Sequence, residues 1–241
     1  MAKVVQKMDP NSLEVLYRDD RVMVINKPSG LLVHRGWGND PVVATDLVQR
    51  ISGSKQVHPI HRLDRGTSGP LLFGLDKETA AILGKQFSER EVEKRYWAFV
   101  RGITPEEGII DHPLPRQKDG PRVPSVTHYT RLCTFERYSL VDAWPQTGRL
   151  HQVRRHLKHI SHPLIGDAKY GKKEHTDLHK NRFGLDRMAL HCWVLVFEHP
   201  TLHTPIECIA NMPADLAEPF AKMQLEPASW ERRIEARRAN T

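Results

Sequence analysis

The chain has 241 residues, and its 36 Lys and Arg against 29 Asp and Glu give a net charge of +7. This length can bury a core without staples, the basic excess is typical of proteins that bind a polyanion such as nucleic acid, and three cysteines without a CxxC pair exclude a disulfide framework and a cysteine zinc site. Since no apolar run suggests a signal peptide or a membrane span, we expect a cytoplasmic protein.

Strand patterns alternate with helical patterns along the chain and predict a mixed α+β fold built on antiparallel sheet. The strand patterns lie at residues 13–28 (two strands around a turn), 57–60, 70–76, 92–102, 125–137, 138–145, 188–200 and 204–213. The helical patterns lie at residues 40–51, 76–88 and 149–160, with a further helix near the end of the chain. Residues 102–124 are rich in Pro, Gly and charge, so we expect a long surface loop there.

The segment HRLDRGTSG at 61–69 places one carboxylate, Asp64, between Arg62 and Arg65 in a predicted loop. Neighbouring guanidinium groups favour an ionised carboxylate, which can act as a nucleophile or as a general base. A structural interpretation also stands, in which Asp64 stabilises the turn and forms a salt bridge with an adjacent arginine. No paired acid, GxSxG elbow or Walker sequence is found, which disfavours hydrolase and nucleotide-binding alternatives.

A basic segment at 149–159 contains four Arg or Lys and three His without one acid. On a helix, Val153 and Leu157 are four residues apart and face the core, while the cations spread over the remaining surface. This pattern predicts a surface that contacts RNA phosphates, with an ordinary solvated helix as the alternative. The candidate contacts are Arg149, His151 and Arg155. A metal at His156 and His159 is disfavoured, since no acidic or cysteine ligand is near.

Several motifs, in family order, resemble those of the RluA-type pseudouridine synthases. They are NKPSGLLVH at 26–34, HRLDRGTSGPLLFGLD at 61–76, KRYWAFVRG at 94–102, TGRLHQVRRHL at 147–157, HPLIGDAKYG at 162–171 and MALHCWVLVFEHP at 188–200. The resemblance implies the pseudouridine-synthase fold, a mixed and largely antiparallel sheet flanked by helices and loops. It also implies an enzyme that isomerises uridine in RNA without a metal or organic cofactor.

The resemblance assigns a role to each of five residues. Asp64 would be the carboxylate that attacks the target uridine, at the ring or at the sugar, and Arg154 would pair with it and orient it. Tyr96 would lie over the uracil and help remove the C5 proton, and Leu190 would be an apolar wall of the base pocket. Arg62 would lie where the base leaves the stack, which a buried base must do before any chemistry can reach it.

The resemblance also sets expectations for the domains and the partner. We expect a flexible N-terminus at 1–12, one catalytic domain at 13–225 and a polar tail at 226–241. Details such as RRHLKHISHPLIGD favour the family's tRNA-directed members, which act on uridine 65, and residues 103–124 and 172–184 are expected to read the substrate. Ribosomal RNA as the substrate and a noncatalytic RNA-binding module are the alternatives. A monomer without membrane contact is expected.

Overall fold

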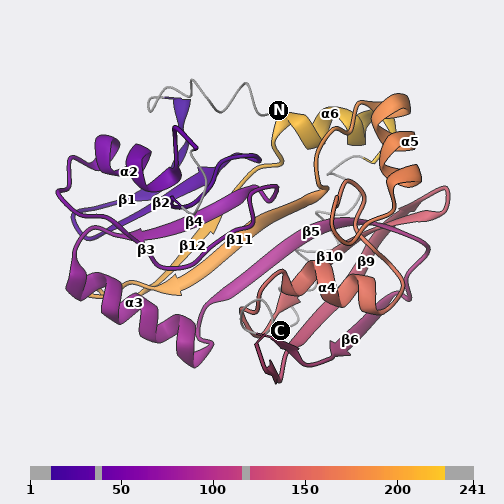
Figure 1. Ribbon diagram of the computed structural model, residues 1–241. Coiled ribbons are helices and arrows are strands. Elements are labelled where there is room, and N and C mark those ends of the chain that lie inside the picture. Colours follow the sequence, from indigo (N-terminus) through magenta and orange to yellow (C-terminus); the bar gives the residue numbers. More distant parts are fainter. Residues whose placement is uncertain (1–11, 36–39, 116–119, 226–241) are drawn as a thin grey trace. The chain divides into compact units, whose positions relative to one another are not determined.

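The computed structural model describes residues 12–35, 40–115 and 120–225 (Figure 1). The expected flexible N-terminus, apart from Ser12, and the expected polar tail lie outside these residues. The chain forms two compact units, and each is described here by itself. The first contains the described residues up to Arg95 together with His191–Asn211, and the second contains Tyr96–Leu190 and the described residues from Met212 onward.

The first unit is a four-stranded antiparallel sheet of order β1-β2-β4-β3 with two helices and a hairpin. Its elements are β1 (Val15–Arg18), β2 (Val22–Lys27), α2 (Ala44–Ser52), β3 (His58–Pro59), β4 (Gly69–Gly74), α3 (Lys77–Glu89), β11 (Leu190–Glu198, whose first residue belongs to the second unit) and β12 (Pro205–Ile209). The predicted strands at 13–28 and the hairpin at 188–213 are confirmed.

Both faces of β2 are buried, because a helix packs on each. Met23 and Ile25 lie in one apolar cluster with Leu47 of α2, whereas Val22 lies in a second cluster with Leu83 of α3. Successive strand side chains point to opposite faces, so each residue step along β2 changes the cluster that it joins. The sheet is therefore held rigidly at the strand ends that carry the loops.

Local sequence signals explain where the two helices of the first unit begin and end. Asp76 accepts a hydrogen bond from the backbone N–H of Thr79 (2.8 Å) and caps α3. Gly53 follows α2 in the left-handed conformation that glycine adopts most easily. The two helices confirm the helical patterns predicted at 40–51 and 76–88.

The second unit is a four-stranded antiparallel sheet of order β5-β10-β9-β6 with a small β7-β8 pair and three helices. Its elements are β5 (Glu93–Arg101, whose first three residues belong to the first unit), β6 (Glu107–Asp111), β7 (Leu114–Pro115), β8 (Arg122–Val123), β9 (Val126–Phe135), β10 (Tyr138–Pro145), α4 (Gln152–His159), α5 (Lys173–Phe183) and α6 (Ala214–Lys222). The strands at 125–137 and 138–145 and the basic helix are confirmed.

One prediction fails in the second unit, and one helix of this unit was not predicted. The surface loop expected at 102–124 contains β6, which pairs with β9 along its whole length and so adds a strand to the sheet. The stretch at 172–184 contains α5, which the sequence pattern did not predict as a helix. Its buried face consists of His175, His179 and Phe183, and two of these three residues are polar.

Candidate active site and RNA-binding residues

Asp64 lies on a tight turn between β3 and β4. The carbonyl of Asp64 accepts the backbone N–H of Thr67 (3.0 Å), which closes the turn. The Asp64 side chain is half-buried, while Thr67 and Ser68 just after it are buried. A rigid turn thus presents a carboxylate that is partly accessible, as a nucleophile or a base must be.

The upstream loop at 26–34 holds this turn in place. The backbone N–H of Gly30 donates to the Arg65 carbonyl (2.7 Å), and the Ser29 hydroxyl donates to the carbonyl of Gly66 (3.0 Å). The Arg65 guanidinium returns a hydrogen bond to the Gly30 carbonyl (3.1 Å) and pairs with Asp40 (2.9 Å). Arg65 therefore acts as a brace between the two loops.

Lys27 is fully buried at the base of the same contact. Its ammonium group donates to the carbonyls of Pro28 (2.9 Å), Leu31 (2.9 Å) and Arg65 (3.4 Å). Lysine is almost never fully buried without polar partners, so these carbonyls explain its position. Sequence reasoning quoted the NKPSGLLVH segment but gave Lys27 no role. The signal available was a lysine inside an otherwise apolar strand.

The downstream end of the turn is anchored to a distant part of the chain. The Ser68 hydroxyl and Nδ1 of His191 are 2.8 Å apart, and Nε2 of His191 lies 3.1 Å from the carbonyl oxygen of Ala210. A carbonyl only accepts, so Nε2 carries the proton and Nδ1 accepts from Ser68. Next to them, Gly69 (φ +124°) lies against the backbone of Cys192, where a Cβ would be 1.9 Å from its carbonyl oxygen.

Arg62 lines a cavity of about 590 Å³ in the first unit. The cavity is lined by Leu32, Val33, His34, Arg35, Arg62, Leu63 and Arg65. Arg35 pairs with Asp46 and Arg65 with Asp40. Arg62 is exposed and forms no ion pair within the part of the chain that the structure describes. The cavity therefore presents one cation whose charge is available to an anion, which suits the predicted RNA-binding role of Arg62.

Arg154, in the second unit, is buried, whereas the helical pattern suggested that it lies on the outer surface. Its Nε donates to Oδ2 of Asp167 (2.7 Å) and its Nη2 donates to Oδ1 of the same carboxylate (2.8 Å). Bidentate pairing of this kind fixes both the position and the plane of a guanidinium. Asp167 thus fixes the guanidinium of Arg154.

Asp167 is held as an anion by its surroundings. Burial acts to raise the pKa of its carboxyl, but the hydrogen bonds and charge of Arg154 and the backbone N–H groups of Tyr170 and Lys169 outweigh burial and lower it. The residue lies in the HPLIGDAKYG motif quoted above, yet nothing in that motif names its partner. The pairing spans 13 residues and depends on how α4 packs.

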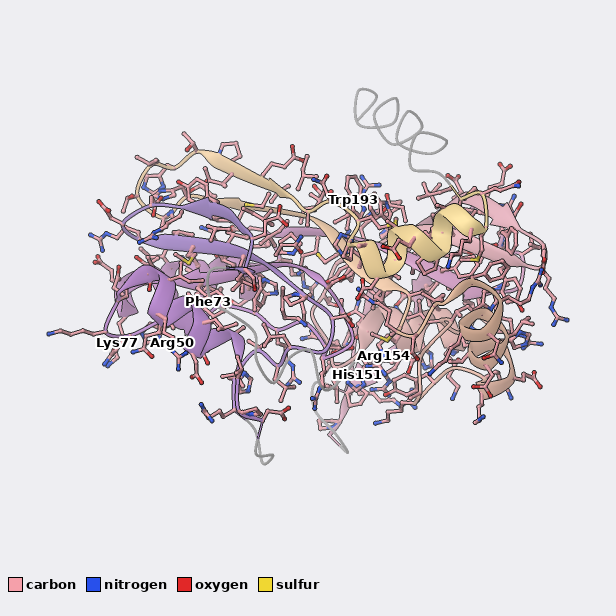
Figure 2. All side chains as sticks on the ribbon, turned by 90° about the horizontal axis from the view of Figure 1, so that it is seen from above. Arg50, Phe73, Lys77, His151, Arg154 and Trp193 are labelled. Carbon is pink, nitrogen blue, oxygen red and sulfur yellow. The ribbon has the colours of Figure 1, made fainter. Side chains whose placement is uncertain are left out.

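The other predicted RNA contacts lie at the start of α4. His151 caps this helix in the left-handed conformation, and its Nδ1 lies 3.0 Å from the hydroxyl of Tyr170. The backbone N–H of Arg149 donates to Oε1 of Gln152 (3.0 Å). Figure 2 shows His151 next to Arg154, one turn apart on this helix. His151 and Arg154 therefore both contact Tyr170, the first through its hydroxyl and the second over its ring.

His156 is engaged on both ring nitrogens. Nδ1 lies 2.8 Å from the Thr127 hydroxyl and Nε2 lies 2.9 Å from the carbonyl oxygen of His112. Burial first, and the neighbouring cations next, lower the pKa of His156. Its role is to attach α4 to β9.

Tyr96 and Leu190 are both buried in the second unit. Tyr96 lies on β5 opposite Ala143 of β10. The backbone of Leu190 is fixed by Arg187, whose Nη2 donates to its carbonyl (3.1 Å) while Nη1 pairs with Asp215 of α6 (2.7 Å). Each side chain is thus set on a rigid element, and their roles toward uracil remain predictions.

Comparison with known proteins gives the class. The RNA pseudouridylate synthase family profile matches residues 21–159, more than half of the chain. The chain belongs to this family, and the predicted enzyme class and α+β fold are confirmed. It is a pseudouridine synthase, an isomerase whose substrate is RNA.

Individual relatives cover most of the chain. The tRNA pseudouridine synthase C of Haemophilus ducreyi is 44% identical over 215 residues, which are 78% of this chain and 86% of the relative. The enzyme of the same name from Pasteurella multocida is 41% identical over 230 residues, 83% and 92% of the two chains. Among solved structures, human RNA pseudouridylate synthase domain containing 4 superposes with a TM-score of 0.73 at 27% identity, covering 93% of this chain and 96% of the human one.

Within residues 12–35, 40–115 and 120–225, no helix has both the length and the apolar character that crossing a bilayer requires.

Proposed function

We propose that this enzyme converts uridine 65 of tRNA to pseudouridine, with Asp64 as the nucleophile. The observation that carries the proposal is the braced turn, which holds a half-buried carboxylate by hydrogen bonds on both of its sides. The tRNA pseudouridine synthase C enzymes, at 36–44% identity, support tRNA as the substrate.

The reaction is an isomerisation, so every atom of the uridine is kept. The C1′–N1 bond breaks, the uracil turns while the Asp64 oxygen holds an intermediate at the ring or at the sugar, and a C1′–C5 bond forms. The C5 proton is then lost and N1 gains a proton, and the Asp64 carboxylate is restored. Tyr96 helps to remove the C5 proton, and Leu190 forms an apolar wall of the base pocket. A flat base packs well between an aromatic and an aliphatic side chain.

In this proposal, Arg154 orients the Asp64 carboxylate and favours its ionised form. Asp167 fixes Arg154. Arg62 occupies the space that the flipped base vacates, which offsets part of the unstacking cost of roughly a few kcal/mol. We assign residues 13–225 to one catalytic domain. We assign the enzyme to the reducing cytoplasm, where cysteines such as Cys133, Cys192 and Cys208 remain thiols. The enzyme acts as a monomer.

The test compares Asp64→Asn with Asp20→Asn, which neutralises an exposed carboxylate on another turn of the same unit. Pseudouridine is mapped in tRNA and in ribosomal RNA after incubation with each protein. Asp64→Asn should lower turnover by ~1,000-fold or more while RNA still shifts in a gel, and Asp20→Asn should behave as wild type. Near-normal turnover of Asp64→Asn would refute the nucleophile assignment.

The same mapping tests the substrate. Modification at uridine 65 of tRNA supports the proposal. Modification only in ribosomal RNA would overturn the substrate assignment, and binding without modification of any RNA would favour a noncatalytic RNA-binding module.

A further inference from the structure

A second hollow lies in the second unit, on the side of α4 that faces the β7-β8 pair. It has a volume of about 280 Å³, just below the roughly 300–1,000 Å³ of small-molecule pockets. We call it the histidine groove. Its lining consists of His112, Leu114, Arg122, Arg155, Lys158, His159 and Tyr170. Arg155 was predicted from the sequence to bind RNA, and His112, Leu114 and Arg122 lie within residues 103–124, which were expected to read the substrate.

Among the residues that the structure describes, the positive charge of the groove has no acidic partner. No carboxylate is among its lining residues, and neither Arg155 nor Lys158 forms an ion pair within the described part of the chain. Helix α5 of the same unit differs, because Lys173, Lys180 and Arg182 pair with Asp177, Asp186 and Glu136. Like charges held close together repel each other. A bound anion would relieve this repulsion, so the groove favours an anionic ligand.

Arg122 is fixed at the opposite wall. Its Nη1 lies 3.0 Å from Nε2 of His112 and 3.2 Å from the carbonyl oxygen of Pro113. Arginine has no acceptor, so Nε2 of His112 accepts and the imidazole is neutral in this arrangement. The remaining N–H groups of Arg122 can donate to a ligand.

The rings of His112 and His159 are stacked, with centroids 3.8 Å apart and planes at 17°. Burial, and after it the charges of His159, Arg122 and Arg155, lower the pKa of His112. His156, which also faces this residue, only contacts its backbone carbonyl.

Tyr170 closes the groove beside α4. Its ring lies 5.8 Å from the Lys158 ammonium and 5.0 Å from the Arg154 guanidinium, and its hydroxyl contacts His151. The backbone N–H of Tyr170 donates to Asp167, which holds Arg154. The groove wall is thus hydrogen-bonded to the same residues that position Arg154.

We propose that the histidine groove binds a backbone phosphodiester of the RNA substrate, with Arg155, Lys158 and Arg122 as its donors. The inference rests on the proposed function, because it names a contact for the RNA on which the enzyme acts. A single phosphodiester fits the groove's modest volume and its lack of any acid.

The test is binding of labelled tRNA by the full chain over about 50–200 mM salt. The double variant Arg155→Gln/Lys158→Gln should weaken binding about tenfold and lower the slope of log affinity against log salt by about one unit, the loss of one phosphate contact. The control Lys77→Gln/Lys85→Gln removes the same charge from exposed positions on α3 and should leave the slope unchanged. An unchanged slope in the first variant, or an equal loss in the control, overturns the proposal.

Two further measurements are needed. The first distinguishes RNA from free phosphate as the source of the anion, and the second distinguishes an error in the groove assignment from an error in the proposed function. Inorganic phosphate should compete with tRNA only at millimolar concentration, whereas micromolar phosphate binding that leaves tRNA affinity unaffected would assign the groove to free phosphate and overturn the RNA assignment. Pseudouridine formation by the wild type is measured in parallel. Its absence refutes the proposed function, whereas activity with unaltered binding of the double variant refutes only the groove. Thermal melting verifies that each variant is folded.

Discussion

Replacing Asp167 with asparagine keeps the shape of the side chain and removes its charge. Arg154 then keeps its charge in a buried position, with side-chain exposure of 10% next to 0% for Asp167. Breaking a buried ion pair from one side costs about 3–5 kcal/mol. The new amide oxygen can still accept from Lys169 and Tyr170, so we expect the lower end, about 3 kcal/mol, or roughly 6–12 °C in Tm.

The matched control is Asp177→Asn, which breaks the exposed pair between Lys173 and Asp177 on α5. An exposed pair of this kind is worth about 0.5 kcal/mol or less. Urea denaturation of wild type and both variants measures the difference directly. A loss below about 1 kcal/mol for Asp167→Asn would refute the buried-pair reasoning.

The positioning role of Asp167 makes a separate kinetic prediction. If Asp167 orients Arg154 for catalysis, Asp167→Asn should lower kcat about 100-fold at a temperature where the variant is folded, with a much smaller change in KM. Arg154→Ala should lower turnover by a similar factor, and combining the two changes should add little. A purely structural role would leave kcat of the folded variant unchanged.

The pH dependence of this pair follows from its lowered pKa. The carboxyl of Asp167 binds a proton less readily in the folded protein than in the unfolded chain. Its contribution to the free energy of unfolding is therefore complete above the unfolded pKa of about 3.9 and is lost as pH falls through the folded pKa. The stability difference between wild type and Asp167→Asn should therefore be constant at neutral pH and shrink at strongly acidic pH. A difference that persists there would contradict the assignment.

Three further predictions concern the first unit. Lys27→Met should destabilise the protein by about 2–4 kcal/mol in urea unfolding, because buried carbonyls, that of Arg65 among them, lose their donor; a neutral effect would contradict this. Gly69→Ala should yield little folded protein in melting experiments, since its Cβ would meet the backbone of Cys192, and a wild-type Tm would refute the close approach. His61 is half-buried, and burial and then the charge of a nearby lysine lower its pKa to about 3. Stability should therefore fall as pH decreases from about 6.5 toward 3. His61→Gln should weaken this pH dependence, and an identical dependence would exclude His61 as its source.

Elements with a local signal were predictable from the sequence. Asp76 caps α3 by accepting a hydrogen bond from the backbone N–H of Thr79, and Gly53 ends α2 by its left-handed backbone conformation. Both features depend on a few adjacent residues. The hairpin of β9 and β10 likewise follows from two apolar runs on either side of a turn. Such features need no knowledge of the rest of the fold.

Elements that depend on distant partners were missed. Strand β6 is stabilised by pairing with β9, and its own sequence, flanked by proline and glycine, indicates a loop. Helix α5 buries His175 and His179, whose polarity conceals the apolar spacing that would predict a helix. Asp167 was quoted within a motif, but its ion pair with Arg154 follows only from tertiary packing.

The hydrogen bond between Ser68 and His191 also has a consequence for synthesis on the ribosome. The two residues are 123 positions apart, so at about 5–20 residues per second the anchor for the turn of Asp64 emerges roughly 6–25 s after the turn itself. A nascent chain that has passed Ser68 still lacks this anchor. Catalytic competence is therefore acquired late in translation, after the strand that begins at Leu190 has left the exit tunnel.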